Sequence, residues 1–74
     1  MQMETERIKA LREDRDLNQT AVAAVLHVSQ TTYSRYENGT LDIPSASLIA
    51  LARFYGTSVD YLLELTDDPV PYRG

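Results

Sequence analysis

The segment from Asn18 to Gly39 predicts two short helices on either side of a tight corner. A capping residue stands before each helix: Asn18 before a helix over residues 19–26, and Ser29 before a helix over residues 30–37. Gly39 follows the second helix, and glycine readily adopts the left-handed conformation that ends a helix. Two helices joined this closely have few ways to pack, so this segment constrains the fold of the whole chain.

The second of these helices has two unlike faces. Tyr33 and Tyr36 lie three positions apart on one face, which we expect to be buried in the core. The side chains on the other face can all donate hydrogen bonds, and none is acidic: Gln30, Thr31, Ser34 and Arg35. A rigidly held helical face of this kind suits the major groove of double-stranded DNA, where Gln pairs with adenine and Arg with guanine.

The segment resembles the helix-turn-helix of the lambda-repressor/Cro-like (XRE) family of bacterial and phage regulators. The matching features are Gln19 at the start of the first helix, the Val22–Ala23 pair, the apolar corner residue Val28 and the ending SRYENG. His27 departs from the family pattern, which usually has Gly at this corner. The position commonly needs a positive φ, and a residue other than Gly costs about 1 kcal/mol there, which bears on stability more than on function.

The resemblance implies an all-α fold, a compact five-helix lambda-repressor-like DNA-binding domain. Capping residues and apolar spacing predict helices at about residues 5–15, 19–26, 30–37, 45–55 and 59–65. Ser45 is the expected cap of the fourth helix. The family often pairs an Arg of the first helix with the Glu of the ENG ending, so the resemblance implies an ion pair between Arg12 and Glu37. A solvent-exposed Arg12 is the alternative.

The two glutamines at the helix starts are the first candidates for DNA contact, because the matching positions in the family usually contact DNA. Gln19 would meet a phosphate and could brace Gln30 as it contacts a base. Arg35 would bind a guanine or clamp a phosphate, Thr31 follows the same logic, and Ser34 is expected near the groove. The remaining phosphate candidates flank the helices, and the first two also serve as caps: Asn18, Ser29, Asn38 and Thr40.

The charge of the chain counts against DNA binding, but its distribution softens that objection. The 74 residues carry a formal net charge of −4, whereas nucleic-acid binders usually have a basic surface. Between Leu17 and Tyr36 there is one arginine and no acidic residue. The predicted DNA-facing surface is therefore locally neutral to positive. Its phosphate contacts should come mainly from neutral donors and helix N-termini.

Other classes of function lack support in the sequence. The chain has no cysteine and His27 is its only histidine, so we expect no disulfide and no metal site. It has no nucleophile–base arrangement and no Gly-rich phosphate loop, so we expect neither an enzyme nor a bound cofactor. The apolar runs are too short to span a bilayer and the first residues are charged, which indicates a cytoplasmic protein with no membrane partner.

The length allows one small domain. We expect residues 1–66 to form the DNA-binding domain and residues 67–74 to form a Pro-containing tail. The sequence LTDDPVPY is similar to the endings of short single-domain XRE regulators in mobile elements of Gram-positive bacteria, which favours a complete protein over a fragment. The tail is expected to be a flexible end. The alternative is an arm, anchored by Tyr72, that packs back or onto a second subunit.

These features predict a sequence-specific transcriptional regulator, a repressor that binds a palindromic operator as a homodimer. One helix over residues 30–37 contacts only a few base pairs, so two copies about 34 Å apart along the duplex are needed to single out an operator. The last helix is the expected dimer surface, because its apolar residues exceed what a small core needs. The alternative function is an antitoxin-like module that masks a protein partner and binds DNA secondarily.

Overall fold

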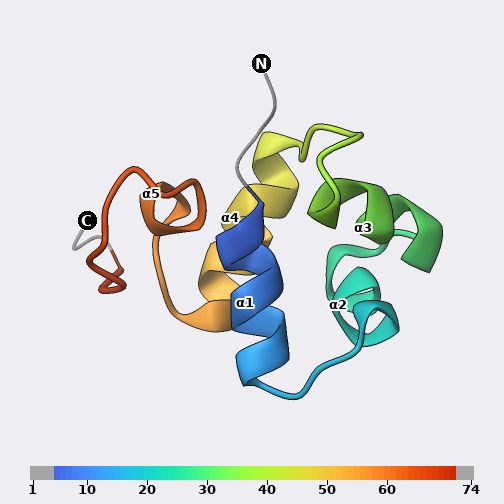
Figure 1. The fold of residues 1–74 in the computed structure, drawn as a ribbon, viewed down its shortest axis with the longest axis horizontal. Helices are drawn as coiled ribbons and strands as arrows, with labels where there is room; N and C mark the ends of the chain where they lie inside the picture. Colours follow the sequence, from blue (N-terminus) through green and yellow to red (C-terminus); the bar gives the residue numbers. More distant parts are fainter. Residues whose placement is uncertain (1–4, 72–74) are drawn as a thin grey trace.

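Five helices account for the fold of residues 5–71, the part of the chain that this computed structural model describes. In chain order they are α1 (Glu6–Asp14), α2 (Gln19–Leu26), α3 (Gln30–Glu37), α4 (Ser45–Tyr55) and α5 (Val59–Leu62). In Figure 1, α1 crosses the middle of the molecule in front of α4, with α2 and α3 on one side and α5 on the other. The described residues contain no strand, and the predicted all-α, five-helix fold is confirmed.

Side-chain caps fix where three of the helices begin. Asn18, Ser29 and Ser58 each accept a hydrogen bond from the backbone N–H three residues later, at 2.8, 3.1 and 3.0 Å. The predicted cap of α4 is wrong: Pro44 is its N-cap, without a side-chain hydrogen bond, and Ser45 is already helical. The ring of Pro44 holds φ at −60°, so the chain enters this helix without help from a side chain.

All five helices of the described region end in the same way, with a residue of positive φ just beyond the last turn. The five residues are Asp16, His27, Gly39, Gly56 and Glu64. After each of them, the next backbone N–H bonds to the carbonyl five residues earlier, at 2.8–3.1 Å, which is the Schellman arrangement. The positive φ predicted at His27 is confirmed.

The helix boundaries differ from the predicted ones at the first and last helices. α1 is one residue shorter at each end than the predicted range 5–15. α5 ends at Leu62, three residues before the predicted end, because the chain turns at Glu64, where φ is 60°. Asp16 causes the early end of α1 in the same way, with a φ of 54°.

Side chains from every helix meet in one core. The fully buried ones are contributed by all five helices: Ile8, Val22, Tyr33, Leu51 and Leu62. The loop before α4 adds Ile43, which is 4% exposed. Burial of this apolar surface is the main favourable term in the stability of such a fold. Each of the five helices is therefore fixed to the same centre.

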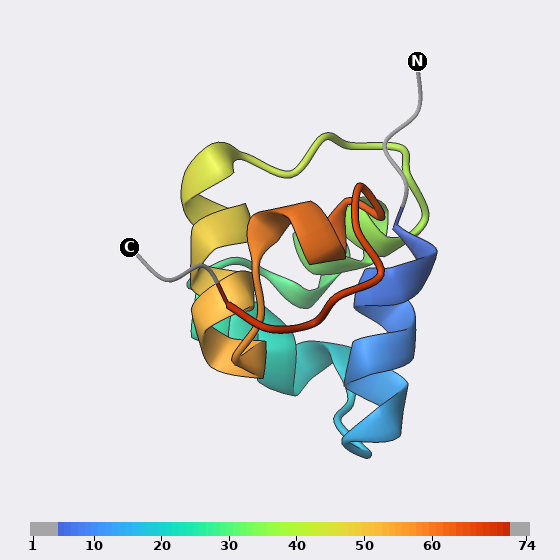
Figure 2. The ribbon, with the colours of Figure 1, turned by 90° about the vertical axis from the view of Figure 1, so that its left-hand side faces the viewer.

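The tail is held against the body of the protein at two points. Arg7 Nη1 of α1 donates hydrogen bonds to the carbonyl oxygens of Tyr61 and Thr66, at 3.0 and 2.7 Å. Thr57 Oγ1 donates to the carbonyl oxygen of Pro69 at 2.7 Å. Figure 2 shows the chain after α5 returning across this side of the molecule. This is the packed-back arrangement for residues 66–70; Tyr72, the proposed anchor, lies outside the described residues.

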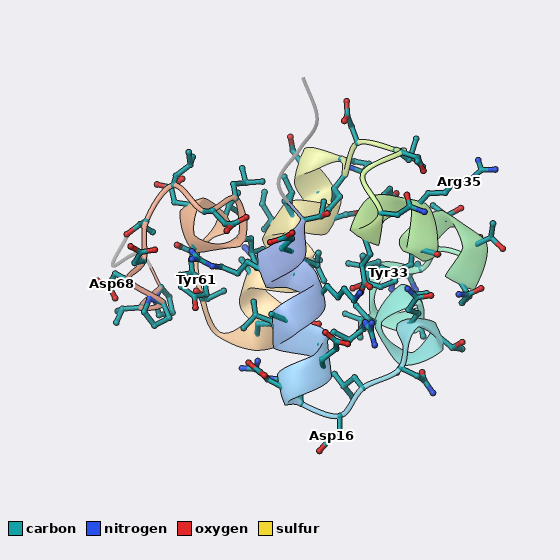
Figure 3. The ribbon with its side chains drawn as sticks, viewed as in Figure 1. Asp16, Tyr33, Arg35, Tyr61 and Asp68 are labelled. Atoms are coloured by element: carbon teal, nitrogen blue, oxygen red, sulfur yellow. The ribbon has the colours of Figure 1, made fainter. Side chains whose placement is uncertain are left out.

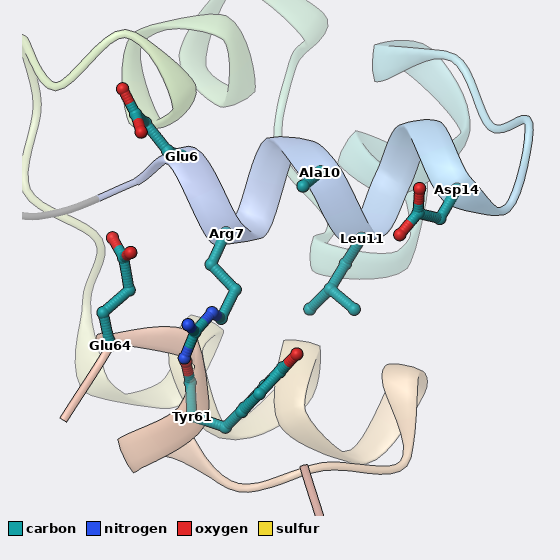
Figure 4. Close-up of a pocket in the computed structure, with 7 residues that line it drawn as sticks. All are labelled: Glu6, Arg7, Ala10, Leu11, Asp14, Tyr61 and Glu64. Atoms are coloured by element: carbon teal, nitrogen blue, oxygen red, sulfur yellow. The ribbon is translucent and has the colours of Figure 1, made fainter. Parts of the chain in front are cut away.

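A cavity of about 250 Å³ lies between α1 and α5 (Figure 4). Its lining residues are Glu6, Arg7, Ala10, Leu11, Asp14, Tyr61 and Glu64. The guanidinium carbon of Arg7 lies 4.3 Å from the centre of the Tyr61 ring, so the cation of α1 is held over an aromatic face of α5. The lining includes no residue of α2 or α3, so the cavity is separate from these two helices.

Candidate nucleic-acid interface

The outer face of α3 carries the side chains predicted to contact DNA. The exposed ones are Gln30, Thr31 and Arg35, and Ser34 is half-buried. On the inner face, Tyr33 and Tyr36 are 0% and 4% exposed, as expected for core residues. Figure 3 shows Arg35 pointing away from the molecule and Tyr33 pointing inward. The helix therefore separates hydrogen-bond donors, which face solvent, from aromatic anchors, which face the core.

The corner between α2 and α3 fixes the direction of this outer face. His27 ends α2 with a φ of 58° and a ψ of 39°, and Val28 then donates its N–H to the carbonyl oxygen of Ala23 at 3.0 Å. Val28 packs against the core, and Ser29 starts α3 at once. With three residues between two packed helices, α3 has little freedom to tilt relative to α2.

An ion pair joins α1 to the last residue of α3. Arg12 Nε lies 2.6 Å from Glu37 Oε2, and Arg12 Nη2 lies 3.1 Å from Glu37 Oε1. Arg12 Nη1 also donates to the carbonyl oxygen of Leu17 at 2.8 Å. The side chains of Arg12 and Glu37 are only 12% and 4% exposed. The pair implied by the family resemblance is thus present, and its two-pronged geometry fixes α1 against α3.

The same carboxylate is linked to the two candidate glutamines. Gln19 Nε2 donates to Glu37 Oε1 at 3.2 Å. Gln30 Nε2 in turn donates to Gln19 Oε1 at 2.6 Å, so Gln19 braces Gln30 in the structure. The sequence predicts the pairs Arg12–Glu37 and Gln19–Gln30 separately, and the link between the two pairs is not predicted. No sequence signal could have connected them, because the link depends on how α2 packs beside the end of α3.

The surroundings of Glu37 keep its carboxylate ionised. Burial would raise the pKa of Glu37, but the hydrogen bonds from Arg12 and Gln19 and the positive charge of Arg12 outweigh it, so the pKa lies below its ordinary value. Burial and the neighbouring Glu37 carboxylate raise the pKa of Tyr33, which stays neutral. The hydrogen bond to Glu37 raises the pKa of Arg12. At neutral pH the carboxylate therefore acts only as a hydrogen-bond acceptor.

The other phosphate candidates lie at the start of α2 and at the two ends of α3, and they are partly engaged within the chain. The Ser29 hydroxyl accepts the Thr32 N–H as a cap and donates to the Thr32 hydroxyl at 3.0 Å. Asn38 Oδ1 accepts both the N–H and the hydroxyl of Thr40, at 3.0 and 2.7 Å. Asn18 is occupied as the cap of α2. These bonds fix the backbone at both ends of the outer face of α3.

The electrostatic character of this surface is mild. Arg35 is the only Lys, Arg, Asp or Glu between Leu17 and Tyr36, and the acidic Glu37 that follows is paired with Arg12. Among the described residues, no group of three His, Cys, Asp or Glu side chains is placed to hold a metal ion. None of the helices in residues 5–71 is long and apolar enough to cross a membrane. The face offers hydrogen-bond donors and one cation.

A helix presented outward by the helix before it, across a short corner, defines a helix-turn-helix domain. The family model described as helix-turn-helix matches residues 8–62, and the chain belongs to this family, in its lambda-repressor/Cro-like (XRE) branch. The fold and the family are those of DNA-binding regulators.

Two curated relatives and one solved structure are similar to this chain. The uncharacterised HTH-type transcriptional regulator YobD of Bacillus subtilis (strain 168) is 38% identical over 69 residues, covering 93% of this chain and 62% of the relative. The cryptic phage CTXphi transcriptional repressor RstR of Vibrio cholerae is 39% identical over 61 residues, covering 82% and 55%. The chain thus spans little more than half the length of these relatives.

The solved structure is the crystal structure of the P22 c2 repressor protein in complex with synthetic operator 9T in the presence of Tl+. It superposes with a TM-score of 0.76 at 31% identity, covering 86% of this chain and 97% of that one. The likeness extends over nearly the whole of the domain in that crystal structure, so it includes α2 and α3 together with the helices that hold them.

Proposed function

We propose that this protein binds specific sequences in double-stranded DNA and represses transcription. The observation that carries the proposal is the outer face of α3, where Gln30 is exposed and is held by a hydrogen bond from its amide to Gln19. A preorganised amide in this position suits contact with a base edge in the major groove. The similarity to a repressor crystallised with an operator supports the same function.

In this proposal α3 enters the major groove with its N-terminal end foremost. Gln30 contacts an adenine, Thr31 and Arg35 contact neighbouring bases or phosphates, and Ser34 lies near the groove wall. Gln19 at the start of α2 contacts a phosphate while it braces Gln30. The flanking polar residues at the two ends of α3 position the backbone of the duplex: Ser29, Asn38 and Thr40.

We further propose that two copies bind a palindromic operator as a homodimer, because one α3 contacts too few base pairs for specificity. The proposed location of the protein is the cytoplasm. The structure limits which residues of the last helix are available for the predicted dimer surface. Leu62 is fully buried and Leu63 is packed against the monomer's own core. Leu65, just beyond α5, is 72% exposed and is the apolar side chain near this end that a second subunit would cover.

Selection of bound duplexes from a random pool tests the proposal. A palindromic consensus is the expected result, with half-sites about one helical turn apart. The same selection with the Gln30→Ala variant identifies the contribution of Gln30, since this variant should stay folded and lose preference at one base position in each half-site. Failure of the protein to enrich any duplex would reject DNA binding as its function.

The alternative, a module that mainly masks a protein partner, has no specific support in the structure. The exposed large apolar side chains of the described residues come from a loop, from α4, and from the end of α5 and the tail: Leu41, Ile49, Phe54, Leu65 and Val70. Apolar side chains scattered over a surface are normal in soluble proteins. We therefore favour the DNA-binding function alone.

A further inference from the structure

Gln30 donates one of its two amide hydrogens to Gln19, and this leaves a defined pair of groups for a base. Gln30 Nε2 lies 2.6 Å from Gln19 Oε1, so one N–H is used and one N–H remains with the carbonyl oxygen Oε1. The major-groove edge of adenine presents one acceptor, N7, and one donor, the N6 amino group. The remaining groups of Gln30 match this edge, and they do not match guanine, which presents two acceptors, N7 and O6.

The orientation of the Gln19 amide decides which groups Gln30 has left. If Gln19 were turned by 180° about its last side-chain bond, its nitrogen would face the Gln30 nitrogen, and Gln30 would have to turn as well so that its Oε1 could accept from Gln19. Gln30 would then offer two N–H groups to the base, which is the complement of guanine. The preference between the two purines therefore depends on what holds Gln19 in the observed orientation.

Glu37 is the group that holds it. Gln19 Nε2 lies 3.2 Å from Glu37 Oε1, and the same oxygen accepts from Arg12 Nη2 at 3.1 Å. An ionised carboxylate has no proton to donate, so only the nitrogen of Gln19 can face it. The Glu37 side chain is 4% exposed, so water does not compete freely for this acceptor. The lowered pKa of Glu37 is consistent with its remaining ionised.

We propose that Glu37, which has no place on the DNA-facing surface, is a positioning residue that sets the base preference of Gln30 through Gln19. The carboxylate fixes the amide of Gln19, Gln19 fixes the amide of Gln30, and Gln30 is left with the groups that select adenine over guanine. The inference rests on the proposed function, because it concerns how the same face of α3 discriminates between bases.

The test compares affinities for two duplexes that differ at one base. The position contacted by Gln30 is the one whose preference is lost in Gln30→Ala, and the measured quantity is the ratio of affinities for adenine and guanine there. In Glu37→Gln, the amide at position 37 can accept from Gln19 or donate to it, so both orientations become available. We expect the ratio to fall at least threefold, since a matched bidentate contact gives about 5- to 150-fold discrimination.

Matched variants separate this role from a structural one. Gln19→Met keeps the length of the side chain and leaves the Arg12–Glu37 pair intact, and it should lower the ratio at least threefold. Arg12→Met combined with Glu37→Gln removes the charge that Glu37→Gln leaves unpaired, so it tests the same step if the single variant does not fold. Arg7→Met weakens the distant attachment of the tail and should leave the ratio unchanged.

The outcomes distinguish the inference from the function. The inference is overturned if the ratio of affinities for adenine and guanine decreases by less than threefold in Gln19→Met or in the folded Glu37 variant. A wild-type preference for guanine at the Gln30 position also overturns it. A fall in Arg7→Met that equals the fall in Glu37→Gln also overturns it, because the loss would then reflect general destabilisation. If no duplex is enriched by the wild type, the proposed function fails, and the inference fails with it.

Discussion

Glu37 shows how one buried acidic side chain can serve both the fold and the site. Its carboxylate accepts hydrogen bonds from Arg12, which belongs to α1, and from Gln19, which belongs to α2. Its backbone carbonyl accepts the hydroxyl of Thr5 at 2.7 Å. A buried charge is tolerated only when such partners replace its hydration. Loss of this one side chain would therefore loosen the contact between α1 and α3 and would also release the two glutamines.

The first prediction concerns stability and pH. Glu37→Gln leaves Arg12 buried without its counter-charge, and we expect a loss of about 3 kcal/mol in the free energy of unfolding at pH 7. The folded-state pKa of Glu37 is depressed, so its contribution is complete above the ordinary value of 4.5 and disappears as the pH falls through the folded pKa. Urea unfolding of both proteins from pH 7 to pH 3 should show the difference shrinking below about pH 4.5.

A difference that stays constant over this pH range would contradict the role of the ionised carboxylate. Lys9, an exposed residue of α1, provides the control, because Lys9→Gln should change stability by less than about 0.5 kcal/mol at any of these pH values.

The second prediction concerns Gln30, whose amide is exposed and makes no core contact that its removal would break. Gln30→Ala should weaken operator binding by about 1–3 kcal/mol and relax the preference at one base position in each half-site. Titration of operator variants checks both effects. Equal affinity and selectivity in the two proteins would remove Gln30 from the base-contacting residues.

At the scale of the helix, the recurring feature is the left-handed residue beyond each C-terminus. Two of the five helices of residues 5–71 use Gly for it, and three use Asp16, His27 or Glu64. A side chain at positive φ costs about 1–2 kcal/mol for most residue types, less for His or Asp. The hydrogen bonds of the Schellman motif and the packing of the next residue offset that cost.

The third prediction follows from this strain. His27 is exposed, so its imidazole is not needed for packing, and His27→Gly should stabilise the protein by about 0.5–1 kcal/mol. His27→Ala is the matched control, since it removes the ring but keeps Cβ at the same φ, and it should not be more stable than the wild type. Chemical denaturation of the three proteins gives the comparison. An Ala variant as stable as the Gly variant would show that backbone strain is not the cause.

These helix ends also show what the sequence could and could not predict. Asn18 and Ser29 identify the starts of α2 and α3 to the residue, because a capping side chain acts within three residues of itself. Asp16 and Glu64 give no comparable signal for the ends of α1 and α5, because neither is the glycine that marks a left-handed helix end in a sequence. The predicted ends of those two helices were wrong for this reason.

The same distinction holds for the candidate site. The separation of Gln30 and Arg35 from Tyr33 follows from helical periodicity, so the sequence predicts which side chains face outward. The hydrogen bond between Gln19 and Glu37 joins residues 18 positions apart on different helices. Its existence depends on the distance between α2 and the end of α3, which only the three-dimensional packing determines.

For the whole molecule, the central question is how a protein of net charge −4 would bind a polyanion. The segment from Leu17 to Tyr36 contains one cation and no acid, and between Gln19 and Thr40 the one acidic residue is Glu37, which is buried and paired with Arg12. Binding would then rely on neutral donors, helix N-termini and shape, with few ion pairs to phosphate. Steering of the protein toward DNA by long-range charge should be weak.

The salt dependence of operator binding measures how many ion pairs the protein makes with phosphates. Each phosphate neutralised by a cation contributes about −0.9 to the slope of log affinity against log salt concentration, so few ion pairs give a shallow slope, on the order of −3 to −5 for a dimer. Arg35→Gln removes one cation from each subunit and should make the slope less steep by about 2 in a dimer. Arg53→Gln, on α4, is the control and should leave the slope unchanged. A wild-type slope near −10 would require a basic surface that the arrangement of charges in residues 5–71 does not provide, and it would place the DNA on a different face of the molecule.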